Sequence, residues 1–563
     1  MKVIIVGGVA GGATAAARIR RQNENAEITV FERSGYISYA NCGLPYYIGD
    51  VITDPEELTL QTPESFFKRF RINMKIHHEV ISIHPECKTV SVKNLENGEI
   101  FEENYDKLIL SPGAKPTQPR LPGVGIDKLF TLRTVEDTFR IKEYINKNHP
   151  KSAVLAGGGF IGLELAENLR ELGMDVTIVQ RPKQLMNPFD PDMASMIHNE
   201  MRKHGIKLVL GYTVEGFKEK DNGVEVLLKD NPSLQADMVV LAIGVTPDTV
   251  LAKEAGLELG IKESIVVNDR METSVPDIYA AGDAVQVKHY VTGNDALISL
   301  AGPANKQGRI IADNICGGDS RYLGSQGSSV IKVFDMTAAT TGINETNAKK
   351  SGLEVDTVIL SPMSHAGYYP GGKVMTMKVV FEKESYRLLG AQIIGYEGVD
   401  KRIDVLATAI HAGLNATQLK DLDLAYAPPY SSAKDPVNMA GFMIDNIAKG
   451  TLKQWHLEDM DKISKDKDVV LLDVRTVCEF SRGHIDGFKN IPVDELRERI
   501  SEIEKGKPVY LICQSGLRSY IASRILEGNG YETYNFSGGF RFYDAVVNDR
   551  ALIERAYACG MDY

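Results

Sequence analysis

The sequence is poor in the features that mark secreted, metal-binding or membrane proteins. It has six cysteines in 563 residues and no CxxC pair, so neither a secreted disulfide framework nor a zinc site is predicted. No apolar run approaches the roughly 20 residues of a membrane helix, and the glycine-interrupted N-terminal stretch does not read as a signal peptide. We therefore expect a cytoplasmic protein with no metal and no membrane partner, whose important cysteines are free thiols.

The sequence also lacks an excess of positive charge. Its 64 lysines and arginines against 75 acidic residues give a net charge of −11 at pH 7. A general nucleic-acid binder needs a positive field, so no nucleic-acid partner is expected. Because the net charge is negative, anionic ligands must be bound by local groups of basic residues. Separately, the length predicts three to four domains at about 150 residues each.

The first thirty residues predict a strand, a glycine-rich turn, a helix and a second strand. The turn, residues 7–12, reads GGVAGG, and Glu32 ends the second strand twenty residues after Gly12. Glycines let a pyrophosphate approach the helix N-terminus, and the acid can bind ribose hydroxyls. We predict a dinucleotide site here, although Val9 replaces the second glycine of the G-x-G-x-x-G motif. An ordinary tight turn is the alternative.

A second unit of the same kind spans residues 152–180. Its turn matches the motif fully, with Gly157, Gly159 and Gly162, so a second dinucleotide is predicted. Further strands end in glycine, as expected where a sheet edge meets a ligand. In one of these, Asp283 follows the glycine at the strand end.

With an α+β stretch over residues 329–445, these motifs resemble the pyridine nucleotide-disulfide oxidoreductase family over roughly the first 445 residues. The resemblance implies an α/β fold with two Rossmann-like domains, the first for FAD and the second for NAD(P)H, and an α+β dimerisation domain that forms a homodimer. The residues assigned to FAD are Gly7, Gly8, Gly11, Gly12, Glu32 and Asp283. Those assigned to NAD(P)H are Gly157, Gly159, Gly162, Gln180 and Arg181.

The choice between the two nicotinamide cofactors depends on the end of the second strand. The acid usual for NAD is replaced there by Gln180, with Arg181 beside it. Loss of the carboxylate removes repulsion against a 2′-phosphate, which Arg181 can bind. NADPH is expected to be accepted at least in part, with NADH as the close alternative.

Near the C-terminus an apolar strand ends at Cys513 and is followed by a glycine-containing loop and a helix. Together with the motifs GHI at 483–485 and NIP at 490–492, this makes residues 463–563 resemble an α/β rhodanese domain. Such a thiol lies among backbone N–H groups near a positive helix end, which lowers its pKa and suits a persulfide anion. Arg518 is expected to add a cation, and Asp473 and Arg475 to brace the loop. A degenerate domain used only for docking is the alternative.

The predicted boundaries follow from these motifs. They are 1–149 and 268–328 for the two parts of the FAD-binding domain, 150–267 for the NAD(P)H-binding domain, 329–445 for the dimerisation domain, 446–462 for a linker and 463–563 for the rhodanese domain.

Cys42 is the cysteine whose surroundings indicate redox chemistry. It lies after the first unit in the stretch SYANCGLPYY, residues 38–47. Dithiol members of the family carry a second cysteine five positions later, where this chain has Tyr47, so Cys42 needs an exogenous thiol partner. The stretch closely resembles the single-cysteine coenzyme A-disulfide reductases, and together with the rhodanese domain it resembles the coenzyme A persulfide/disulfide reductases. The alternative is that Cys42 is an unreactive cysteine that only packs against its neighbours.

The resemblance implies a reaction. Hydride passes from NAD(P)H to FAD, and the Cys42 thiolate attacks a disulfide or persulfide sulfur, forming a mixed disulfide with coenzyme A that is then reduced. The expected substrates are coenzyme A persulfide and coenzyme A disulfide, with polysulfide as a further candidate. The products are hydrogen sulfide and coenzyme A.

Two other functions stay open. An NADH oxidase or peroxidase would use Cys42 as a sulfenate, but such peroxidases carry a histidine in the first glycine-rich turn, where this chain has Ala10. A redox-regulated sulfurtransferase, whose flavin half only senses nucleotide, is the second. The remaining cysteines are expected to be structural: Cys87, Cys316, Cys478 and Cys559.

Coenzyme A requires cations for its phosphates. Arg18 and Arg21 are three apart and share one face of the first helix, although a solvated basic face would look the same. The resemblance implies that coenzyme A contacts Arg18, Arg21, Ser38, Asn41, Asn305, His365 and Lys434. One of Lys68, Arg69 and Arg71 is expected to add a cation.

Tyrosines of the dimerisation domain reach the partner subunit's flavin and thiol in the resembled family. We select Tyr369 and Tyr426, with Tyr368 nearly equal to Tyr369. A phenol near the thiolate can donate a proton to the departing sulfur. The catalytic set is thus Cys42, Cys513, Tyr369, Tyr426 and Arg518, and interface packing is the alternative for the tyrosines.

Overall fold

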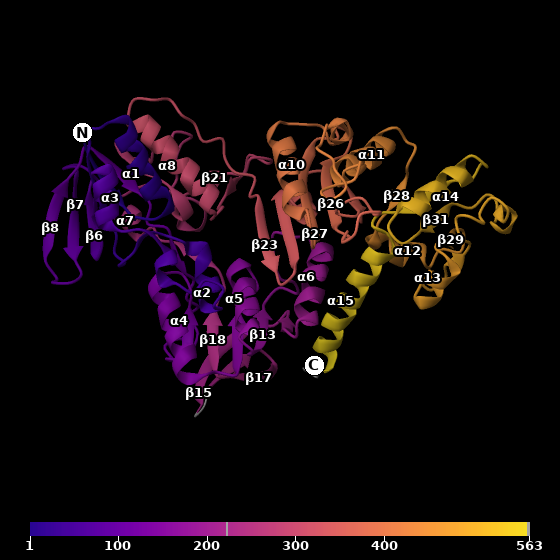
Figure 1. Ribbon diagram of the computed structural model, residues 1–563, viewed down its shortest axis with the longest axis horizontal. Helices are drawn as coiled ribbons and strands as arrows, with labels where there is room; N and C mark the ends of the chain where they lie inside the picture. Colours follow the sequence, from indigo (N-terminus) through magenta and orange to yellow (C-terminus); the bar gives the residue numbers. More distant parts are fainter. Residues whose placement is uncertain (221–222, 560–563) are drawn as a thin grey trace. The chain divides into compact units, whose positions relative to one another are not determined.

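The computed structural model describes residues 1–220 and 223–559, with side chains described as far as residue 555. The chain divides into two compact units (Figure 1). The first comprises Met1–Pro182 and Gly205–Gly327, and the second Lys183–His204 and Ser328–Tyr563. In the part of the chain that is described, no helix is both long enough and apolar enough to cross a membrane.

A parallel sheet with the order β20-β9-β1-β2-β5 carries the first glycine-rich turn. Its strands are β1 (Lys2–Val6), β2 (Glu27–Phe31), β5 (Asn73–Lys75), β9 (Lys107–Leu110) and β20 (Ile278–Ala280). Val3, Ile4 and Ile5 are completely buried, as expected for a parallel strand packed on both faces. Helices α1 (Ala10–Gln22) and α8 (Ala301–Ile315) lie side by side (Figure 1). The predicted strand, turn, helix and strand are confirmed.

A second parallel sheet carries the second turn, with the order β11-β18-β12-β13-β14. Its strands are β11 (Leu129–Thr131), β12 (Ser152–Ala156), β13 (Asp175–Gln180), β14 (Lys207–Leu210) and β18 (Met238–Leu241). Helix α5 (Phe160–Glu171) connects β12 to β13 and packs on both strands. The sheet therefore repeats the unit that positions the first turn, as predicted.

The second unit contains an antiparallel sheet with the order β23-β24-β27-β26-β25. Its strands are β23 (Ser329–Val333), β24 (Met336–Gly342), β25 (Val355–Leu360), β26 (Thr376–Glu382) and β27 (Leu388–Gly395). Helix α10 (Val399–His411) packs on β24 and β27, and α11 (Pro436–Ala448) packs on β25 (Figure 1). Every residue of β27 is buried, which places the core under α10. The predicted α+β domain is confirmed.

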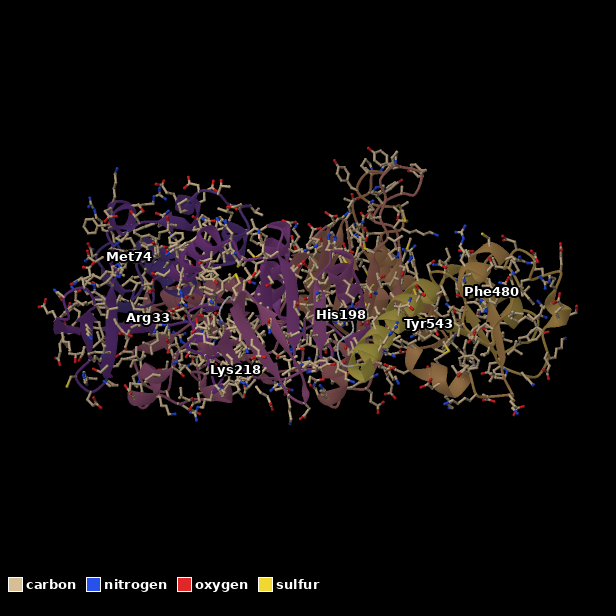
Figure 2. The ribbon with its side chains drawn as sticks, turned by 90° about the horizontal axis from the view of Figure 1, so that it is seen from below. Arg33, Met74, His198, Lys218, Phe480 and Tyr543 are labelled. Atoms are coloured by element: carbon tan, nitrogen blue, oxygen red, sulfur yellow. The ribbon has the colours of Figure 1, made fainter. Side chains whose placement is uncertain are left out.

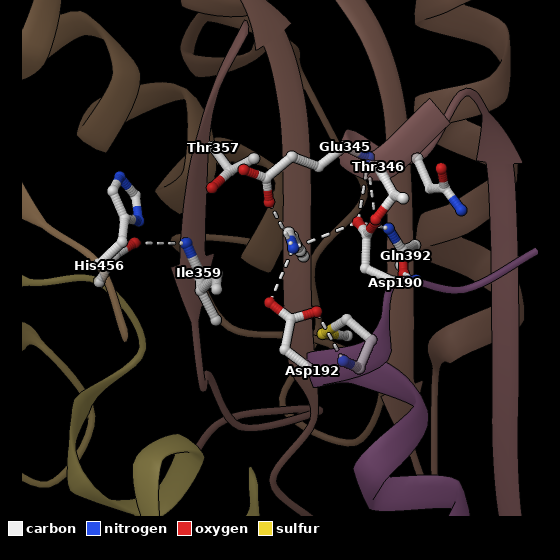
Figure 3. Close-up of polar contacts among 12 residues, drawn as sticks. Asp190, Asp192, Glu345, Thr346, Thr357, Ile359, Gln392 and His456 are labelled. Carbon is white, nitrogen blue, oxygen red and sulfur yellow. Dashed lines mark hydrogen bonds and ion pairs between the residues drawn. The ribbon is translucent and has the colours of Figure 1, made fainter. Parts of the chain in front are cut away.

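Helix α6 (Pro191–Lys203) follows β13 in the sequence, yet it packs in the second unit against β27. Lys378 of β26 holds the start of this helix in place, and its side chain is only 2% exposed. The Lys378 ammonium donates to Asp192 (2.8 Å) and pairs with Asp190 (3.2 Å) and Glu345 (2.7 Å) (Figure 3). Burial opposes the charge of Lys378, but the three carboxylates outweigh it and raise its pKa.

The C-terminal sheet is parallel, with the order β28-β32-β31-β29-β30. Its strands are β28 (Gln454–Trp455), β29 (Val470–Asp473), β30 (Lys489–Asn490), β31 (Val509–Ile512) and β32 (Thr533–Phe536). Trp455 is 2% exposed and donates its indole N–H to the carbonyl of Leu511 at 3.2 Å. This sheet therefore begins inside the segment 446–462, which was predicted as a linker.

The last helix, α15 (Gly539–Cys559), packs along α6. Asp549 accepts from His198 Nδ1 (2.8 Å) and Arg202 Nη1 (2.5 Å), and His198 lies beside α15 (Figure 2). His198 Nε2 accepts the N–H of Leu185 at 2.9 Å, so Nδ1 carries the proton donated to Asp549. These buried contacts join the C-terminal helix to α6.

Candidate active site

The first glycine-rich turn has the geometry that a pyrophosphate requires. Gly7 directly follows β1 with φ of +98°, and a Cβ there would lie 2.1 Å from the carbonyl oxygen of Ser111. A Cβ on Gly12 would lie 2.0 Å from the carbonyl oxygen of Gly7. Glu32 accepts the N–H of Gly8 at 2.8 Å, so the acid predicted for the ribose lies directly against the turn.

A cavity of about 500 Å³ opens at this turn. Its lining includes Gly7, Glu32, Arg33, Pro112, Lys115 and Asp248. Arg33 (2.8 Å) and Lys115 (3.4 Å) both pair with Asp248 in this cavity. The glycine backbone beside the Glu32 carboxylate matches the phosphates and ribose of a dinucleotide, so these residues fit the adenosine half of FAD. Gly11 is buried in the first turn of α1.

Asp283, also predicted for FAD, is held by a residue that the sequence did not indicate. Arg133 Nη2 donates to Asp283 Oδ2 at 2.7 Å. Arg133 follows β11, 150 residues before Asp283 in the sequence, so only the tertiary fold brings the two together. The pair offers both a carboxylate and a cation to a polar ligand.

The second turn repeats the first with one difference. Gly157 has φ of +116°, and a Cβ there would lie 2.2 Å from the carbonyl oxygen of Ala242. A Cβ on Gly162 would lie 2.2 Å from the carbonyl oxygen of Gly157. Gln180 Oε1 accepts the N–H of Gly158 at 3.0 Å, in the position that Glu32 takes at the first turn. A neutral amide thus stands where the first site has a carboxylate.

The rest of the second site is open. A Cβ on Gly159 would meet no atom within 4 Å, so the backbone there is free for a ligand to approach. Arg181 is exposed, and it has no ion-pair partner among the described residues. Its guanidinium is exposed, and its binding of a 2′-phosphate stays a prediction.

Cys42 lies in a one-turn 3₁₀ helix, Asn41–Gly43, just before α2 (Leu44–Ile48). It is exposed and is a free thiol. The carbonyl oxygen of the Asn41 side chain is buried without a hydrogen-bond partner in the described chain. Tyr47 packs edge-on against Phe139 with ring centroids 5.6 Å apart. The thiol is thus accessible, and the position of a second cysteine is filled by aromatic packing.

Glu164 of α5, which the sequence did not single out, is the acidic residue with the largest effect on the charge of Cys42, and Asp283 adds to it. Desolvation raises the pKa of the Cys42 thiol, the carboxylate of Glu164 raises it further, and Arg133 opposes both. Burial raises the pKa of Glu164 itself to about 7, with Glu167 adding to the effect and a hydrogen bond from Tyr46 (3.4 Å) opposing it. A carboxyl group that titrates near neutral pH therefore lies close to the thiol.

The coenzyme A residues predicted in the first unit have different environments. Arg18 Nε donates to Asp313 at 2.8 Å, so its charge is already paired. Arg21 is exposed, and Asn305 accepts from Thr14 at 2.6 Å. Ser38 has a left-handed backbone with φ of +44°.

The predicted basic cluster lies beside the first helix. Lys68, Arg69 and Arg71 are exposed at the end of α3 (Pro63–Phe70). Arg20 of α1 donates to the carbonyl oxygens of Phe70 (2.7 Å) and Arg71 (3.0 Å), which ties the two helices together. The cluster and Arg21 can therefore serve one anionic ligand.

The other predicted coenzyme residues lie on two loops of the second unit. His365 is buried, and its ring meets that of Tyr369 edge-on at 5.6 Å. Tyr368 and Tyr426 share a hydrogen bond of 2.6 Å between their hydroxyl groups, which raises the pKa of Tyr426. Lys434 is exposed. The structure thus pairs Tyr426 with Tyr368 and packs the ring of Tyr369 against that of His365.

Cys513 lies in a loop that surrounds its sulfur with donors. The side chain is fully buried, and Sγ accepts the N–H of Gly516 (3.1 Å) and the hydroxyl of Ser519 (3.2 Å). Helix α14 (Leu517–Glu527) begins at the next residue after Gly516. Its N-terminus adds a partial positive charge. The arrangement is suited to an anionic sulfur.

Two arginines flank this loop: Arg518 in the first turn of α14, and Arg475, which is buried beside the loop. Both Nη atoms of Arg518 donate to Glu479 at 2.7 Å, and this bidentate pair lowers the pKa of Glu479 to about 2. The predicted cation is therefore largely neutralised. Arg475 pairs with Asp473 at 2.7 Å and lies 3.5 Å from Gln514 of the loop, consistent with the predicted brace.

Three of the remaining four cysteines lie among the residues whose side chains are described. Cys87 and Cys478 are exposed and Cys316 is half-buried, and all three are free thiols. The side chain of Cys559 lies outside the described residues. Among the described residues, Cys87, Cys316 and Cys478 have no hydrogen-bond donors placed around the sulfur as Cys513 has.

Comparison with known proteins places the chain among flavoprotein reductases. The family model for pyridine nucleotide-disulphide oxidoreductases matches residues 1–308, the model for the dimerisation domain of that family matches 328–436, and the rhodanese-like domain matches 456–545. The three matches follow one another in the order that the sequence predicted, and the predicted fold class is confirmed.

Three relatives bear on the activity. The coenzyme A disulfide reductase of Staphylococcus aureus is 38% identical over 442 residues, which cover 78% of this chain and 99% of that protein. The crystal structure of reduced Bacillus anthracis CoADR-RHD has 48% identity and a TM-score of 0.95, with 98% of each chain covered. A NAD-dependent persulfide reductase from A. fulgidus has 38% identity and a TM-score of 0.90, with 96% of this chain and all of that chain covered.

Proposed function

Because the chain belongs to the pyridine nucleotide-disulphide oxidoreductase family, we propose that it is an FAD-dependent NAD(P)H reductase of coenzyme A persulfide and coenzyme A disulfide. Polysulfide is a further substrate, and the products are coenzyme A and, from sulfane substrates, hydrogen sulfide. The proposed setting is the cytoplasm, where thiols stay reduced.

The observation that carries this proposal is the pairing of two different thiols in one chain. Cys42 is exposed at the start of a helix, with Tyr47 where a resolving cysteine would stand. Cys513 is buried among N–H and O–H donors. The first setting admits a substrate thiol, and the second holds a sulfane sulfur.

The residues of the first unit support the reductive half of the proposal. FAD would be held by the first glycine-rich turn, Glu32 and Asp283, and NAD(P)H by the second turn with Gln180 and Arg181. When bound, the two cofactors supply the two electrons that reduce a disulfide.

Cys42 performs the sulfur chemistry in this proposal. Its thiolate attacks one sulfur of coenzyme A disulfide, forming a mixed disulfide and releasing one coenzyme A thiolate. With coenzyme A persulfide, attack on the inner sulfur gives the same mixed disulfide and releases hydrosulfide. Two electrons and one proton then return Cys42 as a thiolate and coenzyme A as a thiol. Glu164, with a pKa of about 7, can hold or give up a proton beside this thiol near neutral pH.

Cys513 supplies sulfane sulfur in the same proposal. A donor leaves a sulfur on the Cys513 thiolate, and the resulting persulfide is stabilised by the Gly516 N–H and the Ser519 hydroxyl. Coenzyme A takes this outer sulfur and becomes the persulfide that Cys42 reduces. Covalent fusion raises the effective concentration of one site for the other.

The dimerisation domain supports a homodimer as the working form. In this assembly, Tyr426 or the neighbouring Tyr368 and Tyr369 would serve the partner subunit's thiol. All three tyrosines are exposed in the single chain, so their rings are free to enter such an interface.

The test is an anaerobic titration of the purified yellow protein with NADPH and with NADH, followed by turnover with three acceptors compared at equal concentration. Coenzyme A persulfide and coenzyme A disulfide should both be reduced, the persulfide with stoichiometric hydrogen sulfide. Hydrogen peroxide is the third acceptor. Faster turnover with peroxide than with either sulfur compound would favour the oxidase or peroxidase alternative and overturn the proposal.

A further inference from the structure

A buried ion pair joins two loops that carry predicted coenzyme A and tyrosine residues. The first loop is residues 364–370 and the second is residues 426–435. Arg402 of α10 is 1% exposed, and its Nε (3.2 Å) and Nη2 (3.0 Å) both donate to Asp435 Oδ2. Asp435 is 3% exposed and caps α11 by accepting the N–H of Val437 at 3.0 Å. The pair is therefore fixed at the start of one helix and inside another.

The guanidinium reaches the first loop as well. Arg402 Nη2 donates to the carbonyl oxygen of Ser364 at 3.0 Å, and Nη1 donates to that of Gly398 at 3.1 Å. Ser364 immediately precedes His365. Gly398 has φ of +68°, and a Cβ there would lie 2.0 Å from Nη1, so this close approach requires glycine.

The second loop is held by the same nitrogen. Arg402 Nη2 lies 3.3 Å from the carbonyl oxygen of Tyr430 and 3.1 Å from the hydroxyl of Ser431. Ser431 also donates to Asp435 at 2.7 Å, and its carbonyl oxygen accepts the N–H of Ala366 at 2.9 Å. The two loops are thus joined to each other and to the ion pair.

The predicted site residues extend from this junction. His365 and Tyr369 follow Ser364 on the first loop, and Lys434 directly precedes Asp435 on the second. Tyr426 begins the second loop and bonds to Tyr368 of the first. Each of these side chains is exposed or packs on its own loop, so its position depends on the loop backbone. The guanidinium holds both backbones, the carbonyl of Gly398 and the Asp435 carboxylate from three nitrogens in one plane, a geometry that the ammonium of a shorter lysine does not reproduce.

We propose that Arg402, paired with Asp435, is the positioning residue that sets the spacing between the two loops and so aligns the tyrosine pair and the coenzyme A contacts of the second unit. This inference rests on the proposed function, because it assigns the loops to the reduction of coenzyme A compounds. Arg402 is 1% exposed, so it acts through the groups that it bonds: Ser364, Gly398, Tyr430, Ser431 and Asp435. A misplacement of about 1 Å at such groups is enough to lower turnover about 100-fold.

The test compares Arg402→Met and Arg402→Lys with the wild-type holoenzyme. Arg402→Met should lower kcat/KM for coenzyme A disulfide by at least about tenfold, with KM raised and kcat lowered. Anaerobic reduction of bound FAD by NAD(P)H should stay unchanged, because the glycine-rich turns belong to the first unit. Arg402→Lys keeps the charge beside Asp435 but lacks the planar set of donors, so it should give an intermediate loss, and it keeps the test valid if the methionine variant fails to fold.

Lys378→Met is the matched control, since it removes another buried cation of the same domain, one that pairs with Asp190, Asp192 and Glu345. It should lower the thermal midpoint yet change kcat/KM less than about twofold. A folded, dimeric Arg402→Lys variant with wild-type kcat and KM would overturn the inference. An equal loss of kcat/KM in the Arg402 variants and in Lys378→Met would overturn it as well.

Amide hydrogen exchange separates a failure of this inference from a failure of the proposed function. The amides of Ala366, Tyr369 and Tyr430 should exchange faster in both Arg402 variants than in Lys378→Met, whether or not the protein reduces coenzyme A disulfide. Unchanged exchange at these amides would overturn the positioning role. If the wild type does not reduce coenzyme A disulfide but these amides still exchange faster in the Arg402 variants, the proposed substrate is wrong and the positioning role of Arg402 stands.

Discussion

Glu164 offers the sharpest test of how the first unit controls Cys42. The perturbation is Glu164→Gln, which keeps the size of the side chain and the hydrogen bond with Tyr46 but removes the charge. Burial raises the pKa of Glu164 from 4.5 to about 7. At about 1.4 kcal/mol per pH unit, this difference corresponds to ~3 kcal/mol between the folded and unfolded states.

The sign follows from which state binds more protons. Between about pH 4.5 and about pH 7, the unfolded chain has lost the Glu164 proton and the folded protein still holds it. Stability contributed by this group therefore falls as pH rises through this window, and above about pH 7 the full cost of a buried carboxylate remains. Glu164→Gln should be more stable than the wild type at about pH 8, and the advantage should disappear toward about pH 5.

The assay is the thermal midpoint of the holoenzyme at a series of pH values, with iodoacetamide alkylation of Cys42 measured in parallel after anaerobic reduction. Since the Glu164 carboxylate raises the pKa of Cys42, the variant should be alkylated at lower pH than the wild type. Glu171→Gln, on the exposed face of the same helix, is the control. Parallel stability curves and identical alkylation profiles for Glu164→Gln and the wild type would refute the reasoning.

Three further variants test the rest of the site. Cys42→Ser should keep FAD bound and reducible by NAD(P)H while lowering reduction of both coenzyme A substrates at least ~1,000-fold; turnover near the wild-type rate would exclude the thiol mechanism. Arg181→Ala should raise KM for NADPH roughly tenfold with little effect on NADH, and a strict NADH preference unaffected by the change would refute this assignment. Cys513→Ser should leave coenzyme A disulfide reduction within about twofold but slow hydrogen sulfide release from polysulfide with catalytic coenzyme A roughly tenfold. Equal losses in both assays would assign the C-terminal domain a structural role instead.

The parts of the site that the sequence predicted are those made by neighbouring residues. The turn at Gly7 and the acid at Glu32 belong to one strand–helix–strand unit, whose hydrophobic pattern fixes the distance between them. The same reasoning found Gln180, and the structure bonds it to Gly158 as Glu32 is bonded to Gly8. Cys513 was found because a strand end, a glycine and a helix start follow one another directly.

The residues that sequence reasoning missed act across long distances in the chain. Arg133 bonds to Asp283, and Glu479 neutralises Arg518 from another helix. No local pattern links such pairs, because the contact depends on the tertiary fold. Arg402 shows the same limit: a buried arginine in an otherwise amphipathic helix reads as an ordinary surface position until Asp435 is found beside it.

Aromatic neighbours posed a different problem. Tyr368 and Tyr369 are adjacent, so their side chains point in different directions and the sequence could not choose between them. The structure bonds Tyr368 to Tyr426 and packs Tyr369 on His365. The selection of Tyr369 stays a prediction, and the direct hydrogen bond makes Tyr368 the phenol to substitute beside Tyr426.

The opposite settings of the two thiols explain why one chain would need both. A persulfide anion is reactive, and burial at Cys513 with two hydrogen-bond donors shields it from stray thiols. In the proposed reaction, the same burial disfavours a bulky acceptor, and a thiol on a long flexible arm would collect the sulfur. Coenzyme A has such an arm, and exposure at Cys42 suits a large substrate that must present an internal sulfur to attack. Exchanging the two environments would leave the stored sulfur unprotected and the reductive thiol out of reach of its substrate.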